Sequence, residues 1–388
     1  MMRSATASKP PRRARRRAPS SSIRAFVLAA ILCGCAGLET SPPSIDEAAI
    51  RSERAELQQT AIAHQHDRRR RVASLAWPLL SANADLCGEK TRPAIGAILT
   101  TPESAKALAR GLRESDIRAA GHAEGLQVTV LVEDGPADKA GLREGDRVLQ
   151  IDERQIDGDE QPEKALKGLR KALKRDGRVR MSVASPDGPA RVVTVEAETV
   201  CDFAVQVGRS SAINAYTDGR RLVILPGLER ALADDDPLSL VLAHELAHAM
   251  LRHPRKLQRN AFLTGGVVIG PAASIAGTVG DMALRLVGAE PAVRLSRSGA
   301  ALVTYPYGVE FEREADYVGL YLFARAGGNL DGVEDLYTVF SAESPANTWH
   351  SISHPTTSER RVAVRLIREE IETKQAAGEP LLPNGWTR

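Results

Sequence analysis

The chain has 388 residues, enough for two domains, and its 43% hydrophobic and 26% charged residues are ordinary for a globular protein. Aromatic residues make up only 4%, which argues against a stacking platform for nucleic-acid bases. The net charge of +3 comes from the N-terminus, because residues 1–34 hold eight of the 52 Lys and Arg and no acid, which leaves 44 bases against 49 Asp and Glu, a net charge of −5. A mildly acidic body argues against DNA or RNA as the partner.

The N-terminus has the pattern of an export signal. A basic region precedes the apolar run 25–32, which is too short for a comfortable membrane span. The sequence Leu32–Cys35 resembles a bacterial lipoprotein box, in which the final cysteine, here Cys35, is lipidated and becomes the first residue. Cys33 stands where a small residue is usual, so an ordinary cleaved signal or an uncleaved anchor remains open. By resemblance to sorted lipoproteins, Ala36 favours the outer membrane.

Two further cysteines, Cys87 and Cys201, lie in the body of the chain. Export would place them in an oxidising compartment, where a disulfide can persist. With Cys33 removed and Cys35 lipidated, they form the remaining pair, and we predict a Cys87–Cys201 bridge. Two unrelated buried thiols are the alternative.

The first predicted element of the body is one long helix over residues 46–83. This segment lacks internal Gly and Pro except Pro78, where the helix could break, and it is rich in Ala, Glu, Gln and Arg. His64 and His66 are too close in sequence to share a helix face, so we interpret both as surface residues. The run Arg68–Arg71 is interpreted as a solvated face.

Residues 88–200 have the pattern of a β-rich domain. A helix is predicted at Pro162–Lys174 and strands at Val128–Val132, Arg147–Ile151, Val179–Val183 and Val192–Ala197. The run from Gly135-Pro136-Ala137 through Ala140-Gly141-Leu142 to Gly145-Asp146 resembles a PDZ domain of the bacterial protease type. PDZ domains add a peptide as an extra strand at a sheet edge, so the resemblance implies binding of peptide termini or extended segments. The segment 93–98 is a candidate for the first strand and its loop, and 104–120 for an added helix.

After residue 201 the pattern predicts short strands followed by a buried helix. The strands are expected at Phe203–Val207, Ile213–Gly219 and Leu222–Leu225. The helix that follows has Asp236 as a natural N-cap and Pro237 at its first position.

A His-Glu-x-x-His motif interrupts the apolar sequence of this helix. At 3.6 residues per turn, His244 and His248 lie on one face, where two imidazoles can bind one zinc ion. Glu245 is turned by about 100° from His244, so its carboxylate lies beside the metal and could take a proton from metal-bound water. A chance match or a solvated face is the alternative, but three ionisable groups in an almost wholly apolar turn would be costly to bury without a partner.

The segment 260–280 carries no charge and is rich in Gly, Ala and Ser. We interpret it as a buried or flexible flap near the cleft rather than a membrane-touching hairpin, because its hydrophobicity is weak. Further helices are predicted at Met282–Leu286, Val309–Ala326, Gly332–Phe340 and Ser358–Ala376.

The third metal ligand is expected on the helix 309–326, since a zinc peptidase needs three protein ligands and an open position for water. Glu312 and Asp316 are four residues apart and share a face, so one can bind the metal while the other supports a ligand histidine. Glu310 and Glu314 point elsewhere, and Glu314 is interpreted as a solvated surface acid.

The motif His244-Glu245-x-x-His248 with Glu312-x-x-x-Asp316 resembles the gluzincin endopeptidases of metallopeptidase family forty-eight, which includes HtpX-like and CaaX-prenyl-type proteases. The resemblance covers residues 202–370. It extends to Ile213-Asn214-Ala215, Pro226-Gly227-Leu228, His253, and Ser353–Thr356 with Arg360 and Arg361. The PDZ-like insert and the lack of the usual membrane-spanning helices depart from the minimal family.

The resemblance implies a role for each matching residue. Three residues would ligate zinc, namely His244, His248 and Glu312. Glu245 would be the general base, and Asp316 would support a ligand histidine. Asn214 and Ala215 would line an edge strand that holds the substrate backbone. His354 could approach the metal or the oxyanion, with a helix-cap histidine as the alternative, and His253 is expected to be structural.

We therefore expect an α+β chain, with a mainly helical zincin-like metallopeptidase domain that has a small edge sheet, and an inserted PDZ-like β-rich domain. The expected segments are a signal at 1–35, a tether at 36–45, a leading helix at 46–87, the insert at 88–200, the peptidase domain at 201–376 and a loose tail at 377–388.

The leading functional hypothesis is a zinc endopeptidase with one Zn²⁺ per chain. It would face the periplasm on a lipid anchor and cleave misfolded or incompletely assembled envelope proteins that its PDZ domain helps to select. The alternative is an envelope adaptor or chaperone whose PDZ domain binds peptides and whose zinc site is latent, although a scaffold has no need of Glu245. Prenyl-protein processing would require an intramembrane chamber, against which the weak apolar content argues.

Overall fold

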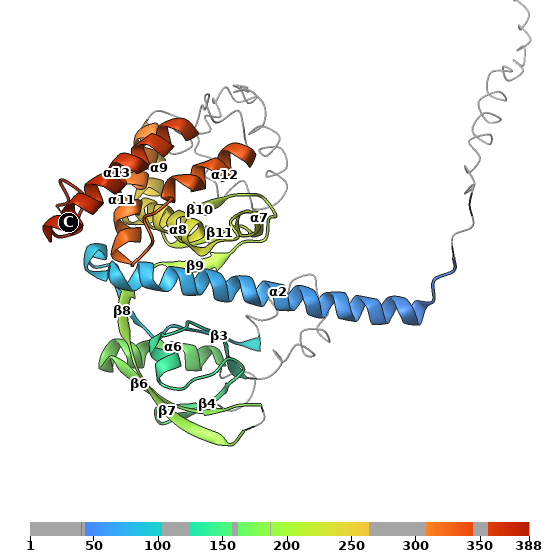
Figure 1. The fold of residues 1–388 in the computed structure, drawn as a ribbon. Coiled ribbons are helices and arrows are strands. Elements are labelled where there is room, and N and C mark those ends of the chain that lie inside the picture. The colour runs from blue at the N-terminus through green and yellow to red at the C-terminus, as the bar shows by residue number, and fades with distance from the viewer. Residues whose placement is uncertain are drawn as a thin grey trace, which may run out of the picture. The chain divides into compact units, whose positions relative to one another are not determined.

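The computed structural model describes residues 40, 43–102, 125–156, 162–186, 188–263, 308–343 and 356–387 (Figure 1). The chain divides into residues 1–53 and 54–388, and the described part of the first unit ends in the opening turns of helix α2 (Glu47–Ala82). Several predictions lie outside the described residues: the signal with Cys35, the helices at 104–120 and 282–286, residues 264–280 of the predicted flap, and His354. Within the described ranges, no helix combines the length and the apolar character of a membrane span.

Helix α2 confirms the long helix predicted from composition, and Pro78 does not break it. Its last turns bury Val72, Ala76 and Leu79, which follow one another at helical spacing on one face. These side chains belong to the same hydrophobic core as the predicted metal-binding helix. Packing of this face holds the helix straight through a residue that disfavours helix interiors.

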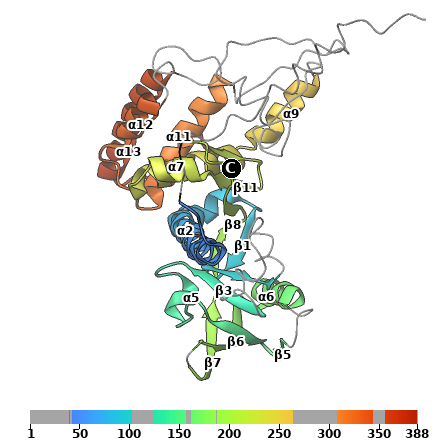
Figure 2. The same ribbon diagram turned by 90° about the vertical axis from the view of Figure 1, so that its right-hand side faces the viewer.

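The β-rich insert forms a sheet with a core of its own. The strand order is β2-β3-β4-β6-β7, with β5 beside β4. The strands are β2 (Ala97–Thr100), β3 (Leu126–Leu131), β4 (Arg147–Ile151), β5 (Arg154–Gln155), β6 (Arg178–Ala184) and β7 (Ala190–Glu196). Helix α6 (Pro162–Asp176) packs on the sheet, and the one-turn helix α5 (Pro136–Lys139) follows β3 (Figures 1 and 2). The alternating burial along β6 is what a strand with one face on a core requires.

The Gly-Asp pair of the predicted PDZ signature, Gly145 and Asp146, lies directly before β4 and connects that strand to its neighbours. Gly145 has a φ of 89°, a conformation that favours glycine, and turns the chain into β4. Asp146 is fully buried, and its carboxylate accepts hydrogen bonds from the Arg143 N–H and the Ser185 hydroxyl, both at 2.8 Å. It also pairs with the Arg191 guanidinium, so one buried acid ties β4 to the β6–β7 hairpin.

The chain enters and leaves the insert at one place. The 3₁₀ helix η1 (Ala84–Cys87) leads to β1 (Thr91–Ala94), which pairs antiparallel with β8 (Glu198–Cys201). The predicted Cys87–Cys201 disulfide is present, with a Cα separation of 5.6 Å. The single strand expected within residues 93–98 is instead the end of β1 and the start of β2, because Gly96, with a φ of 69°, turns the chain between them.

The remaining described residues build the mainly helical region, and the expected α+β class is confirmed. A three-stranded sheet has the order β10-β11-β9, in which β11 is parallel to β9 and antiparallel to β10. The elements are β9 (Ala204–Val207), β10 (Ala215–Thr217), β11 (Arg221–Ile224), α7 (Pro226–Ala231), α8 (Asp235–Met250), α9 (His253–Leu263), α11 (Val309–Arg325), η3 (Val333–Asp335), α12 (Leu336–Glu343) and α13 (Thr357–Ala377). Helices α8 and α11 lie side by side in the centre of one core (Figure 1).

The start of α8 differs from the prediction. The helix begins at Asp235 with Asp234 as its N-cap, so Pro237 stands at the third position instead of the first. Proline is tolerated there because the N–H groups of the first turn have no partner within the helix. Asp235, the first residue of the helix, pairs with Arg71 of α2 at 2.8 Å.

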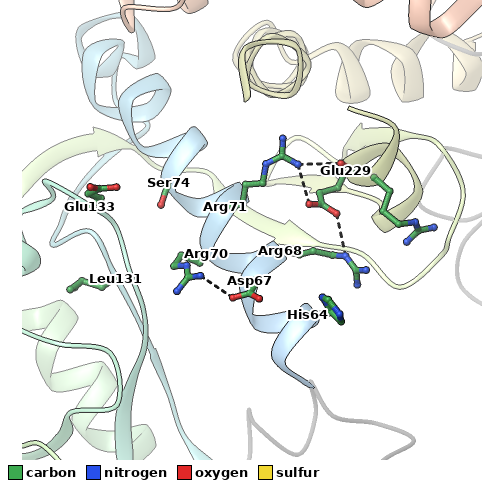
Figure 3. Close-up of a pocket in the computed structure, with 10 residues that line it drawn as sticks. His64, Asp67, Arg68, Arg70, Arg71, Ser74, Leu131, Glu133 and Glu229 are labelled. Carbon is green, nitrogen blue, oxygen red and sulfur yellow. Dashed lines mark hydrogen bonds and ion pairs between the residues drawn. The ribbon is translucent and has the colours of Figure 1, made fainter. Parts of the chain in front are cut away.

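Within the run Arg68–Arg71, which the sequence assigned to a solvated face, Arg68 and Arg71 are partly buried and paired, whereas Arg70 is exposed. Arg71 donates to the Leu232 and Ala233 carbonyl groups at 2.9 and 2.7 Å and pairs with Glu229 of α7 at 3.1 Å. Arg68 also pairs with Glu229, at 3.2 Å (Figure 3). These contacts tie α2 to the segment that leads into α8.

The adjacent face of α2 contacts the insert. His66 is half-buried rather than a free surface residue, and its Nε2 contacts the Thr129 carbonyl oxygen of β3. Glu144 of the insert lies 3.7 Å from His66 Nε2 and 3.5 Å from Arg70 Nη1, whereas His64 is exposed as predicted. Helix α2 therefore packs its apolar face into the helical core and contacts the insert through polar side chains.

A hollow of about 630 Å³ lies where α2, the insert and α7 meet (Figure 3). Its walls include Arg68, Arg70 and Arg71 of α2. Figure 3 shows Arg68 and Arg71 directed at Glu229 and Arg70 at Asp67, so each of these three cations has an acidic partner in the same walls.

Candidate functional site

Three side chains from α8 and α11 converge on one point. His244 Nε2 lies 3.0 Å from His248 Nε2, and a different carboxylate oxygen of Glu312 lies 3.5 Å from each of these nitrogens. One donor atom from each residue lies within 4.8 Å of the other two. Two imidazole nitrogens and one carboxylate are the donor set of a catalytic zinc site that keeps one position open. The residues present therefore fit a metal ion such as zinc.

The two helices can bring these donors together because one glycine lies at their contact. A Cβ on Gly319 of α11 would lie 3.0 Å from the His244 Cα and 3.1 Å from the His244 backbone nitrogen. These separations are tighter than nine in ten real Cβ contacts, so a methyl group here would require the helices to move apart by a few tenths of an ångström. The close approach sets Glu312, two turns before Gly319, opposite the histidine pair.

Asp316 contacts His244 at Nδ1, the ring nitrogen that faces away from the other donors. Its Oδ1 lies 2.9 Å from His244 Nδ1, and Arg360 of α13 donates to both carboxylate oxygens, at 2.8 and 2.6 Å. The Tyr337 hydroxyl lies 3.4 Å from the same Oδ1. Burial raises the pKa of Asp316, but the Arg360 and His244 charges outweigh burial and hold that pKa at about 2. The ionised carboxylate is placed to fix the ring that directs Nε2 toward the other donors.

Glu245 is the acid beside the donor set, as its position after His244 predicts. Its side chain is buried, and its Oε2 has no hydrogen-bond partner among the described residues. Burial raises the pKa of Glu245 to about 7, with the His244 charge acting in the opposite direction. A buried carboxylate that can be protonated or ionised near neutral pH is suited to proton transfer.

His253 lies directly against the second histidine. Its Nδ1 is 2.8 Å from His248 Nδ1, and its Nε2 is 2.9 Å from Glu314 Oε2. Burial lowers the pKa of His253 to about 4, although the Glu314 carboxylate opposes that shift. Glu314 is therefore not simply a solvated surface acid, because its half-exposed carboxylate is engaged by a buried imidazole.

The two predicted substrate-binding residues lie at the start of β10. Ala215 opens the strand and pairs with Ile224 of β11, and the Asn214 carbonyl accepts a hydrogen bond from Leu225 N–H at 3.0 Å. In the described part of the chain, β10 pairs with β11 alone and is the outer strand of its sheet. It also contacts α8, the helix that carries both histidines. His354, the other predicted catalytic residue, lies outside the described residues.

The sequence did not predict the contacts of the residues that support the metal-binding side chains. Arg360 belongs to the family pattern but received no role, and Tyr337 was not singled out. Glu314 was interpreted as a solvated surface acid because it points away from Glu312 and Asp316, and His253 was expected to be structural without a named partner. No spacing rule could have found these contacts, since they join α8, α9, α11, α12 and α13 through tertiary packing.

Comparison with known proteins assigns two regions. Residues 190–368 match the model of peptidase family M48, and residues 127–185 match that of the PDZ domain. No curated protein matches the chain. One similar solved structure is the HtrA3 PDZ domain bound to a phage-derived ligand (FGRWV), with 15% identity, 28% of this chain and 88% of that chain covered, and a TM-score of 0.20. Another is the HtrA-type protease AlgW with a decapeptide, with 27% identity, 28% and 30% of the two chains covered, and a TM-score of 0.18. On the strength of the two family models, residues 190–368 are a peptidase family M48 region and residues 127–185 are a PDZ domain.

Proposed function

We propose that the protein is a zinc-dependent endopeptidase, with His244, His248 and Glu312 as the zinc ligands and Glu245 as the general base. One observation carries the proposal: three donors converge beside a buried carboxylate whose Oε2 has no hydrogen-bond partner in the described residues. An uncompensated buried carboxylate destabilises a fold, and such groups concentrate where chemistry uses them. An adaptor that only binds peptides would gain nothing from keeping Glu245.

A bound zinc ion supplies a Lewis acid for the scissile carbonyl and lowers the pKa of a coordinated water to about 7. Glu245 accepts the proton of the attacking water and passes it to the departing amine, as its pKa of about 7 allows. Asp316 keeps His244 directed at the donor set, and Arg360 keeps Asp316 ionised. The outer edge of β10, beginning at Asn214 and Ala215, would hold the substrate backbone in an extended form.

The substrates we propose are polypeptides of the cell envelope that expose termini or extended segments. The PDZ domain supports this choice, because such domains bind a peptide as an added strand. The leader with Cys35 supports export as a lipoprotein, with the outer membrane favoured by Ala36, and the Cys87–Cys201 bridge suits an oxidising compartment. Lipidation is checked by labelling cells with a radioactive fatty acid, and a Cys35→Ala variant labelled as strongly as the wild type would exclude it.

The activity is tested with the zinc-loaded full chain on β-casein and on an unfolded outer-membrane protein. We expect Glu245→Gln to lower the rate of cleavage by about 10²–10⁴-fold, because it removes the proton acceptor and keeps the shape. Circular dichroism and zinc content should match the wild type. Equal cleavage by both proteins, or none by either, would overturn the endopeptidase proposal, and peptide binding without cleavage would favour the adaptor.

A further inference from the structure

His253 is held in one orientation by stacking and by hydrogen bonds, beyond what packing of a buried residue alone requires. Its side chain is fully buried, and its ring stacks on Phe311 with a centroid separation of 4.5 Å and an interplanar angle of 16°. The ring meets His248 edge-on, at a centroid separation of 4.9 Å. Stacking on one face and hydrogen bonding at both nitrogens leave the imidazole little freedom to rotate.

The turn that delivers His253 also points to a specific placement. Helix α8 ends at Met250 and α9 begins at His253, so a turn of two residues separates the helices. Arg252 in this turn has a φ of 58°, in the left-handed region that is unfavourable for a residue other than glycine. After this turn the ring of His253 lies against His248, five residues earlier, a spacing that does not share a face in an uninterrupted helix.

We propose that His253, held by Glu314, is a positioning residue that fixes the tautomer and the orientation of the metal ligand His248. The inference rests on the proposed zinc site. In this proposal His253 and Glu314 support His248 in the way that Asp316 and Arg360 support His244, and neither of them binds the metal.

The direction of each hydrogen bond follows from the atoms that face one another. His248 Nε2 faces the other donors, so a His248 that binds metal through Nε2 carries its proton on Nδ1. That proton is donated to His253 Nδ1 at 2.8 Å, which requires the His253 proton to be on Nε2. His253 Nε2–H then donates to Glu314 Oε2 at 2.9 Å. The Glu314 carboxylate accepts only, so it sets the polarity of the whole chain of bonds.

This arrangement assigns different tasks to two neighbouring acids of α11. Glu312 faces the Nε2 atoms of His244 and His248, whereas Glu314 contacts Nε2 of His253, the ring nitrogen that points away from His248. Glu310, by contrast, is exposed and contacts only Arg313 among the described residues. Glu310 is therefore a control that removes the same charge from the same helix.

The test compares zinc affinity in two substitutions of the same residue. His253→Leu fills the space but offers no acceptor, whereas His253→Asn places an amide oxygen near the position of Nδ1. Zinc binding is measured on the metal-free full chain by competition with a chromophoric chelator. We expect His253→Leu to bind zinc about 10–100-fold more weakly than the wild type, and His253→Asn to recover most of that loss. The Co²⁺ absorption spectrum should change in the Leu variant and return toward the wild-type spectrum in the Asn variant.

The second comparison is Glu314→Gln against Glu310→Gln. We expect Glu314→Gln to weaken zinc binding by a factor that is smaller than for His253→Leu, because the amide oxygen still accepts a bond but without charge, and Glu310→Gln to have no effect. Wild-type affinity in His253→Leu, equal losses in the Leu and Asn variants, or equal losses in the two Gln variants would overturn the inference. Affinity and the Co²⁺ spectrum do not depend on turnover, so a chain that shows these differences but cleaves nothing would refute the proposed function alone.

Discussion

Glu245 is a buried carboxylic acid, and its environment changes the stability of the fold with pH. Burial raises the pKa of Glu245 from 4.5 to about 7. Between these values the folded chain keeps a proton that the unfolded chain has released, so stability falls as the pH rises through this window. Below about pH 4.5 both states are protonated and no cost remains, and above about pH 7 the cost is complete. Glu245 therefore lowers the stability of the folded chain at neutral pH, and its proposed role in proton transfer explains why a residue with this cost is present.

Replacing Glu245 with Gln should therefore stabilise the metal-free protein. A neutral amide carries no ionisation cost, and each pKa unit corresponds to about 1.4 kcal/mol. We expect metal-free Glu245→Gln to exceed the wild type by roughly 2–3 kcal/mol at pH 8, with the gain shrinking as the pH falls toward 4.5. Urea unfolding across this pH range measures it. The exposed Glu310→Gln serves as the control, and a gain that does not depend on pH would contradict the explanation.

At the scale of elements, the site depends on how closely α11 approaches α8. Twelve of the 16 residues of α8 are buried, so this helix is held on nearly all sides and cannot easily move aside. At Gly319 the α8 backbone at His244 lies directly opposite, 3.0 Å from where a Cβ would stand. A methyl group there would have to separate the helices, and the separation would be felt at Glu312 and Asp316 on the same helix.

We expect Gly319→Ala to destabilise the protein by about 1–3 kcal/mol, the usual range for overpacking, and to weaken zinc binding. The matched control is Gly168→Ala on α6, where an added Cβ meets nothing within 4 Å. That change should stabilise by about 0.5–1 kcal/mol, because alanine is the better helix former, and should leave zinc binding unchanged. Urea unfolding and chelator competition separate the two effects. Equal zinc affinity in Gly319→Ala and the wild type would show that the contact does not position the donors.

At the scale of the whole molecule, one disulfide closes the base of the insert. Cys87 ends η1 and Cys201 ends β8, and the bridge spans 114 residues of sequence. The β1–β8 pair lies directly beside it, with Thr91 opposite Cys201. The described peptidase elements can therefore share one core although the insert separates α2 from the rest in sequence.

Removing the bridge should cost stability without removing a catalytic group. A cross-link that closes a loop of this length restricts the unfolded chain, and losing such a bridge typically costs about 2–5 kcal/mol. We expect the double variant Cys87→Ser, Cys201→Ser to show that loss in urea unfolding followed by tryptophan fluorescence. Dithiothreitol should reproduce the loss in the wild type and leave the double variant unaffected. If the reductant changes neither protein, the bridge does not contribute to stability.

The amino-acid sequence by itself determined the features that depend on spacing within one element. Helical periodicity places His244 and His248 on one face, and it places Glu312 and Asp316 on one face of a second helix. Alternating apolar residues and the glycines at turns were enough to predict four strands of the insert, β3, β4, β6 and β7. The Cys87–Cys201 bridge was predicted from the four cysteines together with the leader pattern, which removes Cys33 and lipidates Cys35 and so leaves one pair.

Only the tertiary structure decided what lies between elements. It placed Glu312 toward the imidazole nitrogens and Asp316 behind His244, beside Arg360. It also brought Glu314 to His253 and engaged the arginines of α2, which the sequence pattern alone had assigned to solvent. Periodicity specifies a direction around one helix axis, whereas these contacts depend on the distance and angle between axes, which the packing of the whole core sets.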